Sequence, residues 1–509
     1  MNKKRLSINF ISGIIQFVTS LIISFFFTPY IVSSVGEEGY GFYSIACTCI
    51  SYFTVLATAM NSMASRFITI AYHNGEEEKV KSYYSTVFYS NLVISFLFSI
   101  IVLFAVANID SFLNVPLVLV SDVKGMFYFV LFSGLLSSVT SVLSSTVFCM
   151  DRLDIKSISL IFISLIKVAV LYCLLTFTDI KLIYLGISYS LSIVLEGLVY
   201  VITTAKMMPI VKLQPKLFSF SAAKELIGSG IWNSINQVNT ILLNGLDLVF
   251  ANVLVSASMA GVLSVAKTIP NQIMSLLLIL SNIFLPSLTI AYSKNDKSGM
   301  KNVFKNSFDV LGLFMGIVLS GFFVLGKEFF ALWMPQVNSN LLYTLSMIGV
   351  SSFLFSGTTQ TIGNAALLAN KLRIPVLVTF LRSLVGVALI LGLSKALSGY
   401  APYFIVGITP LLTIIYDLAF TVPYASKCID IEKRFFYKSK LKFLADFAIL
   451  SVAFYIIKII VKPTSWSSLI FAIVCCAVVG CLFNVFFFLS KESRKNFISK
   501  IKNKLVRSK

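Results

Sequence analysis

Charged residues are scarce in this chain. Only 12% of its 509 residues are Asp, Glu, Lys or Arg, whereas 57% are hydrophobic, and the mean hydropathy is +0.91. A soluble globular protein is typically about 25% charged. So few charges cannot cover a soluble surface of this size, and the composition therefore predicts a membrane protein.

The sequence also lacks the residues that several kinds of site require. His73 is the sole histidine, and most of the eight cysteines lie in apolar runs without the paired spacing of a metal site or a disulfide framework. No GxxxxGK[ST] phosphate-binding loop is present. We therefore expect no metal, no other cofactor and no ATP-driven pump.

Long apolar runs follow one another along the chain. A helix needs about 20 apolar residues to cross a bilayer, and a backbone in lipid must satisfy its own hydrogen bonds. The predicted fold class is all-α, a polytopic membrane protein of about 14 transmembrane helices. The runs are 8–32, 40–72, 82–107, 124–149, 155–178, 181–205, 224–255, 259–292, 304–326, 341–369, 373–394, 400–426, 442–461 and 466–490. The basic start, 1–5, resembles a signal peptide, but no small-residue cleavage site follows it, so we expect a permanent first helix.

Lysine and arginine gather in alternate connections and at both ends of the chain. The opposite connections hold little beyond Lys181, Lys327, Lys395 and Lys462. By the positive-inside rule, both termini are expected on the cytoplasmic side of a bacterial cytoplasmic membrane that the chain crosses many times. These topology signals also account for the net charge of +20, so nucleic acid is not an expected partner.

The chain repeats itself with a shift of 220 residues. Gly41 and Ser44 then meet Gly261 and Ser264, and the segment 69–72 (TIAY) meets an identical segment at 289–292. Six helices per half give a parallel repeat, as in transporters that bind their substrate between two halves. The predicted domains are an N-lobe (1–206), a cytoplasmic linker (207–223), a C-lobe (224–430), two extra helices (431–490) and a basic cytoplasmic tail (491–509). The extra helices are expected to lack buried charge and to lie at the periphery.

Polar residues form stripes on four of the predicted helices, the first, second, seventh and eighth. Spacings of three or four residues place each stripe on one helix face. Such residues either join helices through hydrogen bonds or line a cavity. For Asn236, Gln237 and Asn244, which share one helix, the cavity is favoured. The other cavity candidates are Gln16 and Asn271.

Charged residues inside the predicted helices are costly, at about 2.5–3.5 kcal/mol each near a helix centre. The cations are Arg66, Lys167, Lys267 and Arg382, and the anions are Glu196, Asp247 and Asp417. Lys167 and Glu196, on adjacent helices, either neutralise each other or serve a function. Arg66 and Lys267 lie on the paired stripes, which favours an anionic cargo because both cations suit phosphate.

The run Gly36–Ser44 (GEEGYGFYS) and the segment 247–267 give the chain a family resemblance. They resemble the polysaccharide-transporter branch of the multidrug/oligosaccharidyl-lipid/polysaccharide exporter superfamily. The resemblance covers most of 1–430. It implies a Wzx-type flippase for undecaprenyl-diphosphate-linked oligosaccharides, used for O-antigen, capsule or related polymers, with a cavity lined largely by helices 1, 2, 7 and 8.

The resemblance also implies roles for particular residues. Arg66 and Lys267 would bind the diphosphate, with Arg382 and Lys167 behind them. Independently of the resemblance, the acids Glu196, Asp247 and Asp417 within the predicted helices are the candidates for carrying a coupling proton or sodium ion. The expected partners are the lipid-linked oligosaccharide, membrane lipids and the polysaccharide polymerase machinery, and the expected oligomeric state is a monomer.

Two related transporters remain as alternatives, a lipid II-type flippase and a multidrug/cation antiporter. The first helix lacks the arginine cluster of the lipid II flippases, which weakens the first alternative. A membrane-embedded glycosyltransferase or polymerase usually needs a sizeable outer loop with charged residues. The outer loops here are short and poor in charge, so we predict that the chain is not an enzyme.

Overall fold

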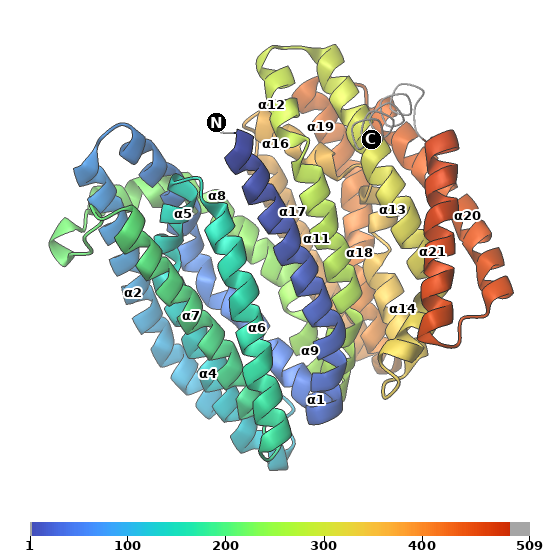
Figure 1. Cartoon of the computed structure of the whole chain (residues 1–509), viewed down its shortest axis with the longest axis horizontal. Coiled ribbons are helices and arrows are strands. Elements are labelled where there is room, and N and C mark those ends of the chain that lie inside the picture. The colour runs from blue at the N-terminus through green and yellow to red at the C-terminus, as the bar shows by residue number, and fades with distance from the viewer. Residues whose placement is uncertain (1–2, 489–509) are drawn as a thin grey trace, which may run out of the picture. The chain divides into compact units, whose positions relative to one another are not determined.

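The computed structural model describes residues 3–488, and within that range every regular element is a helix (Figure 1). The chain packs as two units, Met1–Ser264 and Val265–Lys509. Twelve helices are long and apolar enough to cross a membrane, and the bent pair Ser339–Ser356 and Gln360–Leu368 gives a thirteenth span. The predicted helical membrane bundle is therefore confirmed. The predicted basic tail, 491–509, lies outside the described residues.

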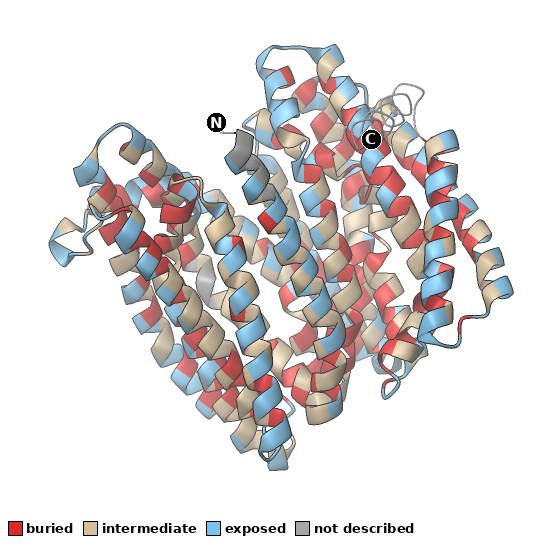
Figure 2. Ribbon diagram, in the orientation of Figure 1, coloured by how far each residue is buried: buried red, intermediate tan, exposed pale blue. Residues whose placement is uncertain are grey.

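Large apolar side chains cover the outer surface of several helices. On α21 (Trp466–Phe483), Ile470, Phe471, Val474 and Val478 are between 53% and 60% exposed. Figure 2 shows the exposed residues of this helix in pale blue along much of its length. An apolar surface of this extent is stable only against lipid.

The first unit consists of long helices that pack side by side, with α4 against α7 and α1 against both α6 and α8. Its helices are α1 (Lys3–His73), α2 (Glu77–Ala107), α3 (Ile109–Phe112), α4 (Val120–Thr140), α5 (Ser145–Cys149), α6 (Leu153–Phe177), α7 (Ile183–Met207), α8 (Phe220–Thr240) and α9 (Asp247–Leu254). Helix α10 (Ala257–Ala266) crosses the boundary between the units.

Helix α1 contains two of the predicted spans. At Gly36 the backbone leaves the helical conformation, with φ 75° and ψ 169°. Glycine adopts such a positive φ without steric cost because it has no Cβ. One residue thus replaces the connection expected between 32 and 40. Counting α1 as two spans makes the structure consistent with the predicted fourteen.

Buried hydrogen bonds join the helices of the first unit. Asn91 on α2 is fully buried, and its Nδ2 donates to Ser138 O on α4 at 3.0 Å and to Asn61 Oδ1 on α1 at 2.9 Å. Tyr84 Oη lies 2.8 Å from Thr146 Oγ1. Polar side chains in lipid commonly join helices in this way.

Three glycines allow very close approach between α1 and the helices α8 and α10. A Cβ on Gly230 would lie 1.8 Å from Ala59 O, and one on Gly261 would lie 1.9 Å from Glu37 O. A Cβ on Gly41 would lie 2.6 Å from Gly261 N. Gly41 and Gly261, which are related by the 220-residue shift, thus both lie at this close approach.

The repeat is also visible in the backbone of two turns. Gly75 has φ 77° and Asn295, 220 residues later, has φ 51°. Each turn has the same hydrogen bonds: Gly75 N to Tyr72 O at 3.1 Å corresponds to Asn295 N to Tyr292 O at 3.0 Å. The second turn continues into α13, where Asp296 Oδ1 accepts from Gly299 N at 2.8 Å. This bond, together with one from Ser298, holds the pKa of Asp296 below its ordinary value.

The second unit contains several broken helices. Its α-helices are α11 (Thr268–Asn282), α12 (Leu285–Ser293), α13 (Lys297–Trp333), α14 (Ser339–Val350), α15 (Phe353–Ser356), α16 (Asn364–Leu368), α17 (Arg373–Ala396), α18 (Ala401–Tyr416), α19 (Val422–Ile429), α20 (Lys433–Val461) and α21 (Trp466–Phe483). The bent pair that contains α14 to α16 turns by 68°. A π-helix, η7 (Asp417–Thr421), interrupts the span formed by α18 and α19.

Helix α20 brings charged residues into the interior of the second unit. Lys440 is only 3% exposed and Asp446 only 4%, and Lys458 Nζ lies 2.7 Å from Glu328 Oε1 on α13. The expectation that the last two helices lack buried charge is therefore wrong. These residues lie on the same helix face as buried phenylalanines. The face therefore reads as apolar in the sequence, although it carries charged residues.

Gly230→Ala is expected to destabilise the protein although alanine is the better helix former. The added methyl group would overlap Ala59 O, and overpacking of this kind costs about 1–3 kcal/mol. Gly228→Ala on the same helix is the matched control, because nothing lies within 4 Å of its Cβ position. Thermal unfolding of the purified protein in detergent should show a lower midpoint for Gly230→Ala alone. Equal midpoints for both variants would contradict the close approach.

Candidate functional site

The predicted site residues divide between the two units, so their joint site stays a prediction. The first unit contains Gln16, Arg66, Lys167, Glu196, Asn236, Gln237, Asn244 and Asp247, and the second contains Lys267, Asn271, Arg382 and Asp417. Of these residues, the structure places Arg382 and Asp417 around one cavity.

This cavity has a volume of about 340 Å³ and lies within the second unit. Its walls come from α11, α17, α18 and the broken segments α15, η5 (Gln360–Gly363), α16, η7 and α19. Breaks in transmembrane helices release backbone groups that would otherwise bond within the helix, and they often mark binding sites. The hydroxyls of Ser352, Ser356 and Thr413 add further polar groups.

Arg382 presents its guanidinium group to this cavity. The group lies over the ring of Tyr416, with 4.5 Å between its carbon atom and the ring centroid. Nη1 donates to Thr413 Oγ1 at 3.5 Å, which is a weak bond, and Nε has no partner. A cation that stacks on an aromatic ring and retains a free donor is suited to binding an anion.

Aromatic rings extend from Arg382 along one side of the cavity. Tyr416, Phe420 and Tyr424 are four residues apart and stack with centroids 5.1 Å apart in each pair. Thr379 Oγ1 donates to Tyr416 Oη at 3.1 Å and fixes the first ring. Stacked rings offer flat apolar surfaces of the kind on which sugar rings and alkyl chains pack.

Asp417 also lines the cavity, but it is already paired. The buried ammonium group of Lys440 on α20 donates to Asp417 Oδ2, to Phe355 O at 2.7 Å and to Thr359 Oγ1 at 2.6 Å. A coupling ion at Asp417 would have to displace this ammonium group. The predicted role of Asp417 in ion coupling therefore stays a prediction that competes with an ion pair.

The burial of Lys440 was not predicted from the sequence. The signal was present in the helix periodicity. Phe436, Phe443 and Leu450 are fully buried, and Lys440 falls on the same face at spacings of three and four residues. A lone cation on an apolar helix face predicts a buried partner.

In the first unit, Lys167 does not neutralise Glu196. Lys167 Nζ donates to Tyr43 Oη at 3.1 Å and lies 5.0 Å from the ring centroid of Tyr189. Glu196 instead accepts from Tyr200 Oη at 2.8 Å. Of the two interpretations that the sequence left open, the structural pairing is therefore not the one formed, and an aromatic cage holds the lysine.

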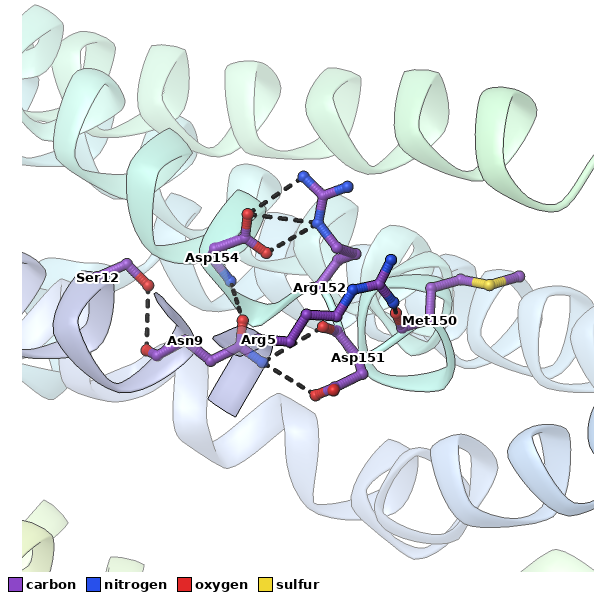
Figure 3. A network of polar contacts seen from close by, with 7 residues as sticks. All are labelled: Arg5, Asn9, Ser12, Met150, Asp151, Arg152 and Asp154. Atoms are coloured by element: carbon purple, nitrogen blue, oxygen red, sulfur yellow. Dashed lines mark hydrogen bonds and ion pairs between the residues drawn. The ribbon is translucent and has the colours of Figure 1, made fainter. Parts of the chain in front are cut away.

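Asn9, the first residue of the polar stripe on α1, has a structural role (Figure 3). Asn9 Nδ2 donates to Asp151 Oδ1 at 2.9 Å, and its Oδ1 accepts from Asp154 N at 3.0 Å. Arg5 Nη1 donates to Met150 O at 3.5 Å. These bonds join the start of α1 to the connection between α5 and α6, so Asn9 acts as an interhelical bridge. Gln16, two turns further along, is half-buried.

On α8 too, some residues of the polar stripe join helices, whereas others are exposed. Ser234 Oγ donates to Val55 O at 2.9 Å, whereas Asn236 and Asn244 are exposed and Gln237 is half-buried. After this helix the π-helix η4 (Ile241–Gly245) leads to Asp247, whose Oδ1 accepts from Leu248 N at 3.0 Å. Asn236 on α8 and Asn244 within η4 are thus the exposed amides of this stripe.

The remaining candidates are Arg66, which is exposed on α1, Lys267, which is half-buried between α10 and α11, and Asn271, which is exposed on α11. Within residues 3–488, no group of three or more His, Cys, Asp or Glu side chains could hold a metal ion.

Comparison with known proteins identifies the family. Residues 7–289 match the family described as Polysaccharide biosynthesis protein. The chain belongs to this family. The resemblance to the polysaccharide-transporter branch is thereby confirmed. The chain is also 27% identical to the uncharacterized membrane protein EpsK of Bacillus subtilis (strain 168) over 501 residues, which is 96% of this chain and 97% of that protein.

Solved structures with the same fold include transporters and a flippase. One is an inward-facing multidrug resistance MATE family transporter of the MOP superfamily, which has a TM-score of 0.69 and 13% identity. The match covers 84% of the chain described here and 99% of the transporter. Another is the lipid II flippase MurJ in an inward closed conformation, which has a TM-score of 0.66 and 13% identity. This match covers 95% of the chain described here and 98% of MurJ.

Lys440→Met is expected to lower the stability of this family member strongly. It leaves the Asp417 carboxylate buried without its partner, which costs about 3–5 kcal/mol. Asp417→Asn combined with Lys440→Met should recover most of the loss, because no unpaired charge remains. Lys438→Met, at an exposed position on the same helix, is the control. Unfolding midpoints would contradict the ion pair if the single and double variants were equally stable.

Proposed function

We propose that this protein is a flippase that moves undecaprenyl-diphosphate-linked oligosaccharide units across the bacterial cytoplasmic membrane by alternating access. The product would serve the synthesis of a surface polysaccharide of the capsule or O-antigen type. The observation that carries the proposal is the family match over more than half of the chain. A flippase of the same fold also covers more of this chain than the MATE transporter does.

The difference in coverage favours a lipid-linked cargo. The MATE neighbour covers 84% of the chain and the lipid II flippase 95%. This difference, 11% of the chain, is about the size of α20 and α21 together, without the tail. A multidrug/cation antiporter, which is the second alternative, needs no counterpart for these helices.

In this proposal the cations hold the diphosphate. Arg66 and Lys267 would grip the phosphates, while Arg382 and Lys167 would lie further along the path. The amides of Gln16, Asn236, Gln237, Asn244 and Asn271 would bond sugar hydroxyls, and the polyprenyl chain would remain in lipid. The charge of Arg382, which lines the 340 Å³ cavity and has only a weak bond to Thr413, supports an anion there.

The arrangement of basic connections supports the proposed orientation. With both termini in the cytoplasm, the connections 208–219, 293–297 and 369–373 face the cytoplasm, and each carries two Lys or Arg residues, as the positive-inside rule requires. The cargo would then enter from the side on which it is assembled. A polysaccharide polymerase is the partner expected on the opposite side, and the protein is expected to act as a monomer.

A lipid II-type flippase is the second candidate function, because MurJ has the same fold. The absence of an arginine cluster on the first helix argues against it. Complementation separates the two. Rescue of a strain depleted of its lipid II flippase would support the second candidate, and rescue of a strain lacking its polysaccharide flippase would support the proposal.

Arg66→Ala and Lys267→Ala are each expected to reduce export of surface polysaccharide by about tenfold or more. Loss of a charged hydrogen bond costs about 1.5–3 kcal/mol, and every 1.4 kcal/mol is a factor of ten. Lys216→Ala, at an exposed position in the predicted linker, removes the same charge as a control. Polysaccharide would be measured at the cell surface and normalised to protein in the membrane. Normal export by the double variant at normal protein level would exclude the diphosphate-binding role.

A further inference from the structure

The interior of the second unit contains a carboxylate that has no hydrogen-bond donor. Asp446 on α20 is 4% exposed, and within the described residues neither of its oxygens has a partner. Asn484, at the start of the π-helix η8 (Asn484–Phe488), is fully buried beside it. Its Nδ2 donates to Leu313 O at 3.3 Å, but its Oδ1 has no partner.

Gly316 on α13 makes the space for this cluster. A Cβ on Gly316 would lie 2.5 Å from Asp446 Oδ2 and 3.4 Å from Asn484 Nδ2. The two polar side chains therefore lie against the same glycine. Three acceptor oxygens gather at this point inside the membrane, and no donor among the described residues serves any of them.

Among the described residues, no charged group on the neighbouring helices donates a hydrogen bond to Asp446. Lys442, one turn before Asp446 on α20, donates to Phe488 O and lies 3.7 Å from Asp309 Oδ1 on α13. Asp309 itself is an acceptor, and α21 and η8 carry no charged side chain. Lys442 thus lies near Asp446 without bonding it.

A single proton would remove the charge of this cluster and supply one donor. An ionised carboxylate is costly in lipid when it is unpaired, whereas a protonated one is neutral and gains one O–H donor. The O–H group of the protonated acid would supply a donor for Asn484 Oδ1, which has none among the described residues. The only bond formed or broken is the O–H bond, and the proton is exchanged with water.

A cavity that can hold water lies one helical turn from Asp446. A cavity of about 250 Å³ lies between α13 and α20, lined by Lys305, Asp309, Lys438 and Lys442 among others. Lys442 is one turn from Asp446 and its side chain is 44% exposed. Water in this cavity would therefore come within a helical turn of the buried acid.

We propose that Asp446 is a proton-binding site through which this protein couples proton movement to transport. Its role in transport rests on the proposed function, but its protonation does not. The site lies on α20, outside the repeated halves, and differs from Glu196, Asp247 and Asp417.

Infrared spectroscopy of the full chain in liposomes tests the protonation directly. Wild-type protein at neutral pH should show the carbonyl band of a buried carboxylic acid. Asp446→Asn should lose this band, while Asp179→Asn, at an exposed position, should keep it. An unchanged band in Asp446→Asn would overturn the proposal. So would loss of the wild-type band when sodium replaces potassium, because the site would then bind a metal cation.

A flipping assay tests the coupling in the same liposomes, with polyprenyl-diphosphate oligosaccharide as the lipid. With one proton per cycle, a gradient of about one pH unit should shift the distribution of this lipid between leaflets by about tenfold. Asp446→Asn is a neutral isostere, which should keep the wild-type unfolding midpoint and lose this shift. A shift of wild-type size in the variant would overturn the coupling. If wild-type protein moved no lipid at all, the proposed function would fail while the infrared result would stand.

Discussion

Polar atoms that lie inside a membrane have no water to bond, so each must find its partner within the chain. This constraint explains most of the interior of both units. It places Asn91 where it reaches two other helices, and it places the ammonium group of Lys440 among a carboxylate, a carbonyl and a hydroxyl. It also explains why the exceptions are informative, since an unpartnered polar atom here is far more costly than one at a soluble surface.

The exceptions gather in the second unit, where the helices are broken. Arg382 keeps a free Nε beside the bend between α14 and α16, and Asp446 lies beside the π-helix that follows α21. In the first unit the exposed amide of Asn236 on α8 likewise precedes a π-helix, η4. Interrupted helices and unsatisfied side chains thus occur together. This coincidence is expected at sites that exchange a ligand rather than hold a permanent structural contact.

Much of the fold could be predicted from the sequence because lipid imposes a simple rule on length and polarity. The spans, the repeat and the turn at 69–76 with its copy at 289–296 all follow from apolar runs and identical residues. The pairing of buried charges did not follow. Helix adjacency made a pair of Lys167 and Glu196 one of two interpretations, but Tyr43 and Tyr189 hold the lysine instead, because rotation about the helix axis decides which side chains meet. Lys440 and Asp446 were overlooked because a single charge does little to lower the hydropathy of a long apolar helix.

The single residue that joins the two halves of α1 has a practical consequence for topology mapping. Because Gly36 alone interrupts the helix, that end of the first unit has no loop there into which an epitope tag or a protease site could be inserted. An insertion would break two spans rather than extend a connection. Reporters for that side of the membrane belong instead in the connections 113–116 and 178–182, where the chain leaves the helical conformation over several residues.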